Sequence, residues 1–211
     1  MSMGSDLLFV LEILGTVAFA FSGAMLAIEK KMDIFGVAIL GMTTAVGGGI
    51  IRDLILGLNP PTAFVRPVYA LTAIAVSIIV FFPFVRNAVN RTERFGRLLL
   101  FVLDTVGLGL FTAAGIETAF SANVGASPFL LIFVGVVTGV GGGVMRDIFA
   151  REMPAIFVKH FYACASLLGA AAYTVTVSFL GHDPAMLVCI FTVIALRILA
   201  FRFKWNLPRP K

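Results

Sequence analysis

The sequence has little charge: Asp, Glu, Lys and Arg make up 13% of its 211 residues, against about 25% in an ordinary soluble domain. Apolar residues make up 60%, and the mean hydropathy is +1.04. One small globular core cannot hide that much apolar surface, so most of it must face lipid. The composition excludes a soluble domain and indicates a polytopic membrane protein.

Cysteine and histidine are also scarce, with two of each and neither at metal-ligand spacing. No nucleophile, base and third group fall at motif spacing, so we expect no enzyme, no metal site and no cofactor. The net charge of +5 could suggest nucleic-acid binding, but the sequence has no aromatic and basic motif typical of that function. We interpret the excess positive charge as charge that orients the protein in the membrane. Residues 1–6 carry no positive charge, so we expect the first apolar run to be a permanent span and not a signal peptide.

Apolar runs bounded by charged residues, Pro or Gly predict seven transmembrane helices. They cover, approximately, residues 7–28, 34–56, 66–85, 97–118, 128–149, 157–179 and 184–203. The expected fold class is therefore an all-α membrane protein, with residues 1–211 in a single transmembrane domain.

The distribution of positive charge predicts the orientation of these spans. With the N-terminus outside, Arg66 is the only basic residue in the outside segments, and Arg52 and Arg146 lie within spans. The other thirteen of the sixteen Lys and Arg residues, Arg197 among them, then lie on the inside. The positive-inside rule therefore places the N-terminus outside and the C-terminus in the cytoplasm.

The chain also contains an internal duplication. Residues 8–12 match 100–104, residues 45–53 match 139–147, and residues 64–70 match 157–163. Repeat one covers about 7–85 and repeat two about 97–179, each with three spans, so the two copies lie in the membrane with opposite orientation. Inverted repeats typically build a polar pathway at their interface. The seventh helix, at about 184–203, lies outside the duplication, and we expect it to pack at the periphery.

Each copy carries three consecutive glycines, then two apolar residues, then Arg-Asp. The glycines are Gly47, Gly48 and Gly49 in the first copy and Gly141, Gly142 and Gly143 in the second. Each glycine lowers helix propensity by about 1 kcal/mol relative to Ala, so we expect the second and fifth helices to break or kink there. A break is tolerated in a membrane only where it is buried in protein or lines an aqueous cavity. The alternative is that the glycines allow close packing between helices.

Ionisable residues inside spans are costly to bury, which makes them candidates for a gate, although structural pairing is the alternative. Arg52 lies four residues past the central glycine, which is about 6 Å along a helix, in the same half of the membrane as Glu12. The inversion relates Asp104 and Arg146 in the same way. We therefore predict two intramembrane ion pairs, Glu12 with Arg52 and Asp104 with Arg146.

Further polar residues lie close to the glycines. Adjacent helix residues point about 100° apart and do not face each other, so Asp53 and Asp147 are expected to face the pathway. The uncharged polar residues are Thr43, Thr44, Thr138 and Ser22. With carbonyls freed at a helix break, their hydroxyls would make an oxygen lining suited to monovalent cations.

Two inverted three-helix units plus a seventh helix, with Gly-Gly-Gly-x-x-Arg-Asp in the second and fifth spans, resemble the prokaryotic branch of the trimeric intracellular cation (TRIC) channels. The resemblance covers essentially the whole chain, and both copies of the motif are intact. It implies a homotrimer in a prokaryotic inner membrane, in contact with lipid, whose protomers each carry a pore pinched at the kinked helices. It also implies permeation by K⁺, with Na⁺ as a second candidate ion.

The leading hypothesis is therefore a passive cation channel. The alternative is a secondary transporter of a small solute such as glycine, because inverted repeats also build transporters and some classifications describe the duplicated unit as a glycine transporter. A non-transporting scaffold would leave the duplicated Arg-Asp unexplained. An unpaired arginine at the pinch would repel cations, so conduction requires the predicted ion pairs to neutralise Arg52 and Arg146.

Overall fold

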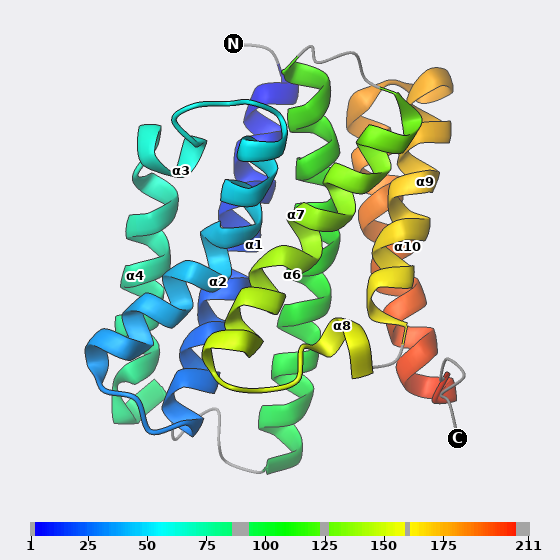
Figure 1. The fold of residues 1–211 in the computed structure, drawn as a ribbon. Coiled ribbons are helices and arrows are strands. Elements are labelled where there is room, and N and C mark those ends of the chain that lie inside the picture. Colours follow the sequence, from blue (N-terminus) through cyan, green and yellow to red (C-terminus); the bar gives the residue numbers. More distant parts are fainter. Residues whose placement is uncertain (1–2, 86–92, 123–126, 159–160, 206–211) are drawn as a thin grey trace.

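The computed structural model describes residues 3–85, 93–122, 127–158 and 161–205, which form a bundle of long helices (Figure 1). In chain order the helices are α1 (Met3–Glu29), α2 (Ile34–Ile55), α3 (Thr62–Val65), α4 (Val68–Phe81), α6 (Glu93–Ser121), α7 (Pro128–Phe149), α8 (Ala155–Val158), α9 (Tyr162–Leu180) and α10 (His182–Phe203). The described residues contain no strand, so the predicted all-α class is confirmed.

Six of these helices are long and apolar enough to cross a membrane, namely α1, α2, α6, α7, α9 and α10. The expected third span, 66–85, is shorter than predicted, because α4 has only 14 residues, or about 21 Å of helix. Pro67 caps its start, and Phe82 has ψ 137° immediately before Pro83. Proline disfavours a helical residue before it, which ends α4 at this point.

The two sets of three helices run in opposite directions (Figure 1). We call the end at which α1 begins the upper end and the opposite end the lower end, as they appear in that view. Helices α1, α2 and α4 run down, up and down, whereas α6, α7 and α9 run up, down and up. Helix α10 then runs down, so the described chain begins and finishes at opposite ends of the bundle.

The ends of α2 and α7 are built by the same backbone motif from different residues. The Asp33 side chain accepts a hydrogen bond from the third residue of α2, and the Ser127 side chain does the same in α7. After each helix the chain turns through a left-handed residue, Gly57 at φ 70° and Arg151 at φ 56°. The N–H groups that follow bond back to the carbonyls of Asp53 and Asp147, which satisfies the last turn of each helix.

Helices α2 and α7 cross in direct backbone contact. A Cβ added to Gly48 would lie 2.3 Å from the Thr138 carbonyl oxygen, and one added to Gly142 would lie 2.0 Å from that of Thr44. Both helices are continuous through their glycines, so of the expected break or kink the break is wrong, and the kink stays a prediction. The glycines at this crossing allow close packing, which was the alternative reading of the motif.

A second matched contact lies in the centre of the bundle, between α1 and α6. Phe19 and Phe111 occupy equivalent positions in the two copies, and their ring centroids are 5.1 Å apart. The Phe19 ring packs on Gly107, and the Phe111 ring packs on Gly15. Each half of the chain therefore supplies both a ring and the small residue that receives the other ring.

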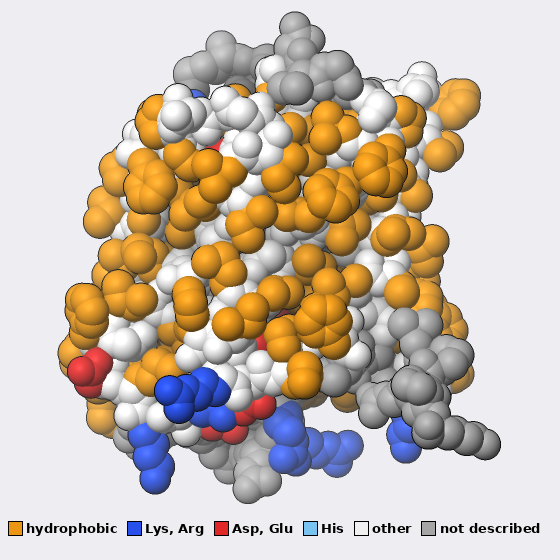
Figure 2. Space-filling model, viewed as in Figure 1, with side chains coloured by type: hydrophobic (Ala, Val, Ile, Leu, Met, Phe, Trp, Pro, Cys, Tyr) orange, Lys and Arg blue, Asp and Glu red, His pale blue; other side chains and the backbone are white. Residues whose placement is uncertain are grey.

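The surface matches a membrane environment. Figure 2 shows hydrophobic side chains along the height of the bundle and Lys and Arg side chains gathered at its lower end. Phe35 and Phe191, for example, are 71% and 74% exposed. Apolar surface of this extent is stable only against lipid or another protein.

The helix crossing predicts a difference between neighbouring glycines. Gly142→Ala should destabilise the protein by about 1–3 kcal/mol, because the new methyl group meets backbone that has no room to move. Gly49→Ala should be neutral or stabilising, because the nearest atom to its added Cβ lies 3.7 Å away. Thermal unfolding of both variants in detergent tests this, and equal effects would contradict a tight crossing.

Candidate functional site

The upper cluster consists of Glu12, Arg52, Asp53 and Tyr69, which α1, α2 and α4 bring together. Arg52 is only 4% exposed, and its Nε donates to Asp53 Oδ1 at 2.8 Å. Its Nη1 lies 3.6 Å from Glu12 Oε1, so the predicted pair of Glu12 with Arg52 is present. The Tyr69 hydroxyl donates to the other oxygen of Glu12. The guanidinium is therefore held between two carboxylates.

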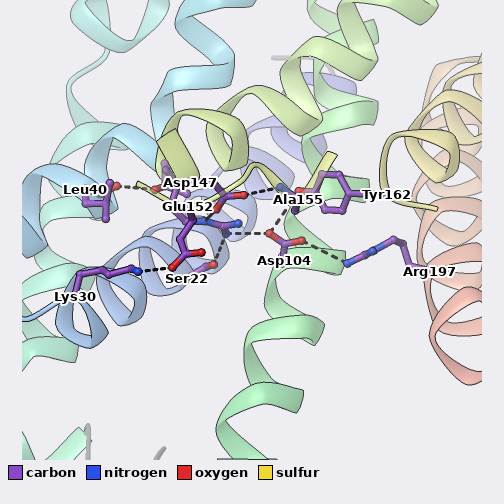
Figure 3. Close-up of polar contacts among 11 residues, drawn as sticks. Ser22, Lys30, Leu40, Asp104, Asp147, Glu152, Ala155, Tyr162 and Arg197 are labelled. Carbon is purple, nitrogen blue, oxygen red and sulfur yellow. Dashed lines mark hydrogen bonds and ion pairs between the residues drawn. The ribbon is translucent and has the colours of Figure 1, made fainter. Parts of the chain in front are cut away.

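The lower cluster consists of Asp104, Arg146, Asp147, Tyr162 and Arg197, from α6, α7, α9 and α10. Arg146 Nε donates to Asp147 Oδ1 at 2.9 Å, and its Nη1 donates to Asp104 Oδ1 at 3.0 Å. The second predicted ion pair is thus also present. The Tyr162 hydroxyl lies 3.4 Å from the same oxygen of Asp104. Figure 3 shows Tyr162 and Arg197 side by side next to Asp104.

The aspartates of the two motifs do not behave as the sequence analysis expected. Asp53 and Asp147 are buried, at 0% and 5% exposure, and each binds the arginine that precedes it. The angle between adjacent Cβ atoms did not exclude this contact, because the long arginine side chain can turn its Nε back toward the neighbouring carboxylate. Both aspartates are therefore engaged in structural contacts, and Asp53 also lines a small cavity; that they face a pathway stays a prediction.

Each of these aspartates also fixes the start of the next short helix. Asp53 Oδ2 accepts the N–H of Thr62, the first residue of α3, at 2.6 Å. Asp147 Oδ2 accepts the N–H of Ala155, the first residue of α8, at 2.8 Å. The Arg-Asp of the motif thus links a long helix, its neighbour in the bundle and the segment that follows.

The seventh helix contributes a residue that the sequence analysis assigned to the cytoplasmic side. Arg197 is 5% exposed, and its Nη2 lies 3.6 Å from Asp104 Oδ2. Its guanidinium lies over the rings of Phe101 and Tyr162, with distances to the centroids of 4.9 and 4.7 Å. Helix α10 packs on α9 and α6 at the edge of the bundle, as expected, and it also completes the lower cluster (Figure 1).

The uncharged candidates are placed mainly by their own helices. Thr44 donates to the Leu40 carbonyl at 2.6 Å, and Thr138 donates to the Val134 carbonyl at 2.7 Å. Thr43 is half-buried, and Ser22 accepts a hydrogen bond from Arg146 Nη1 at 2.6 Å. Because α2 and α7 are unbroken, the oxygen lining from freed carbonyls is not formed in this arrangement.

The remaining glycines differ in their surroundings. Gly47 faces the Met145 sulfur, and Gly141 packs on the Gly48 Cα. Gly49 and Gly143 instead leave space next to Arg52 and Arg146, whose Nη2 atoms would lie 3.7 and 3.8 Å from an added Cβ. A methyl group at Gly49 would therefore fit beside the guanidinium, whereas one at Gly143 would lie 3.1 Å from the Tyr162 hydroxyl.

A small cavity borders the upper cluster. Its volume is about 30 Å³, which is room for a water molecule or a small ion. Glu12, Arg52, Asp53 and Tyr69 line it on the polar side, together with Gly49, and Phe111 is among its apolar lining residues. The cavity thus joins the charged residues to the centre of the bundle.

Comparison with known proteins places this arrangement in a family. A family model described as "Glycine transporter" matches residues 9–84 and 101–178. The inner membrane protein YadS of Escherichia coli K12, a UPF0126 protein, is 37% identical over 207 residues, which cover 96% of this chain and 95% of that protein. The UPF0126 membrane protein YvgT of Bacillus subtilis is 33% identical, with 94% of each chain covered.

Solved structures are similar over the same length. A structure reported for conductance through TRIC cation channels is 38% identical, with 96% of each chain covered and a TM-score of 0.81. The TRIC trimeric intracellular cation channel orthologue from Rhodobacter sphaeroides is 34% identical, with 94% of this chain and 98% of that chain covered and a TM-score of 0.85.

The two arginines should differ in their effect on stability. Arg146→Ala should cost about 3–5 kcal/mol, because it leaves Asp147 buried without its guanidinium. Arg52→Ala should cost less, about 1–3 kcal/mol, because Glu12 and Asp53, the two carboxylates that it leaves, both border a cavity that can admit water. Unfolding in detergent measures both, with the exposed Arg202→Ala as the control. The account fails if Arg146→Ala costs no more than Arg202→Ala.

Proposed function

The chain belongs to the prokaryotic branch of the trimeric intracellular cation channel family, and from this premise we propose that it is a passive channel for monovalent cations, chiefly K⁺. Na⁺ is the second candidate ion. The likeness that supports the proposal extends over 96% of the chain, to a structure reported for conductance through TRIC cation channels. The proposal assigns no enzymatic step and no cofactor to the chain.

The observation that carries the proposal is the pairing of both buried arginines. A bare guanidinium beside a pore repels cations. Here Arg52 lies 2.8 Å from Asp53, and Arg146 lies 2.9 Å from Asp147 and 3.0 Å from Asp104. Each buried arginine is thus paired with nearby carboxylates, so neither presents a bare guanidinium to a passing cation.

The proposed route runs from the cavity at the upper cluster, past the crossing of α2 and α7, to the lower cluster. At the crossing, Gly48 and Gly142 lie against the backbone of the opposite helix, so conduction requires α2 and α7 to move apart. Met145 of α7 also packs on Gly47 of α2 at this crossing, so opening the contact moves that side chain as well.

The proposed assembly is a homotrimer with one pore in each protomer, by analogy with the trimeric channel orthologue of Rhodobacter sphaeroides. The lower end is proposed to face the cytoplasm, because Lys and Arg gather there (Figure 2). This orientation places the N-terminus outside. An inner membrane location is supported by the description of the Escherichia coli relative as an inner membrane protein, and the exposed apolar side chains are proposed to contact lipid.

Single-channel recording of the purified protein in a planar bilayer under a KCl gradient tests the proposal. We expect discrete current steps that reverse near the K⁺ equilibrium potential. Replacing K⁺ by Na⁺ on one side measures selectivity between the two ions. Arg146→Ala should alter conductance or gating, since it removes the positive charge that Asp104 and Asp147 share.

Glycine transport is the alternative, because the matching family model bears the description "Glycine transporter". Uptake of labelled glycine into proteoliposomes discriminates between the two functions. Silent bilayers together with saturable glycine uptake would overturn the channel proposal and assign the same helices to a transporter.

The proposed orientation predicts the behaviour of C-terminal fusions in a bacterial host. A green fluorescent protein joined after residue 211 should fluoresce, because that protein folds in the cytoplasm. Alkaline phosphatase joined at the same place should be inactive, because it requires export. The reverse pattern would place the lower end outside.

A further inference from the structure

The two charge clusters differ in their composition. The upper cluster holds two carboxylates and one guanidinium, whereas the lower cluster holds two carboxylates and two guanidiniums. Counting each carboxylate as −1 and each guanidinium as +1, the upper cluster sums to −1 and the lower cluster to zero. The duplicated part of the sequence does not cause this difference, because both copies contribute the same three charges.

The difference comes from Arg197 alone. It lies on α10, which has no counterpart in the first half of the chain, and it reaches Asp104 from the side opposite to Arg146. Arg66 also interacts with Tyr69, but its side chain is exposed, so it is not counted among the buried and half-buried charges of the upper cluster.

The position of Arg197 is well defined. Its guanidinium lies over the rings of Phe101 and Tyr162. One Nη points toward Asp104 (Figure 3). Arginine is suited to this geometry because its planar guanidinium stacks on aromatic faces while its N–H groups bind a carboxylate. The extra positive charge is therefore a fixed feature at one end of the proposed cation route.

We propose that Arg197 makes conduction direction-dependent, by cancelling at the lower end the negative charge that remains at the upper end. This inference rests on the proposed channel function. Fixed charge at a pore entrance raises or lowers the local concentration of permeant ions. The upper entrance concentrates cations and the lower entrance does not, so cations entering from the upper end carry the larger current.

Recording Arg197→Gln in symmetric 0.1 M KCl tests the inference. The variant gives the lower cluster the same net charge as the upper cluster. At equal and opposite voltages, we expect the current of cations entering at the upper end to exceed that entering at the lower end in the original protein, and this ratio should fall in the variant. The current entering at the lower end should rise by up to about tenfold, which is the low end of the effect of focused charge on local ion concentration.

Three controls separate this effect from a structural one. Arg197→Lys keeps the charge and should retain most of the asymmetry. Arg202→Gln removes an exposed charge from the last turn of the same helix and should leave the current ratio unchanged. In 1 M KCl, where the Debye length is about 3 Å instead of about 10 Å, the difference between Arg197→Gln and the original protein should shrink.

A variant in the other cluster tests the same charge account if Arg197→Gln does not fold. Glu12→Gln neutralises the upper cluster, so it should also bring the current ratio to one, by lowering the current that enters at the upper end. If the original protein conducts but the current ratio is the same in the folded variants, the inference about Arg197 is overturned. Silence of the original protein would instead overturn the channel proposal.

Discussion

The cost of burying charge in a membrane is the constraint on which this structure depends. Arg52 and Arg146 lie in helices surrounded by apolar residues, and each is tolerated there because two carboxylates surround it. One carboxylate comes from a neighbouring helix, which ties two helices together. The other, Asp53 or Asp147, also receives the first N–H of α3 or α8. A single electrostatic requirement thus positions a long helix, its neighbour and the following turn.

Much of this could be predicted from the sequence. Hydropathy and the duplication indicate the helices and their opposite directions, and the depth of a residue along a helix is enough to pair Arg52 with Glu12. Helix propensity alone, about 1 kcal/mol per glycine, favours a break or kink at the glycines, but α2 and α7 are unbroken there. Unsatisfied backbone groups in lipid cost several kcal/mol each, so a helix that packs its glycines closely remains intact.

Other features required the three-dimensional arrangement. Spacing rules describe where a Cβ points and not how far a flexible side chain can turn, so they missed the contact of Arg52 with Asp53. Arg197 sits outside the repeat, in a run of residues whose depth depends on how α10 packs against α6 and α9. Counting it with the cytoplasmic charges was reasonable for an isolated helix, but its aromatic and acidic neighbours come from other parts of the chain.

The crossing of α2 and α7 has the form of an isologous interface. Gly48 of α2 meets Thr138 of α7, and the equivalent Gly142 of α7 meets the equivalent Thr44 of α2. Such a contact can form between two copies of the same sequence. A single three-helix unit that inserts into the membrane in both orientations could therefore make this contact as an antiparallel dimer. In such a dimer every substitution would appear twice, once at each membrane face. Joining the two units in one chain removes that coupling, and a seventh helix can then approach one half without approaching the other.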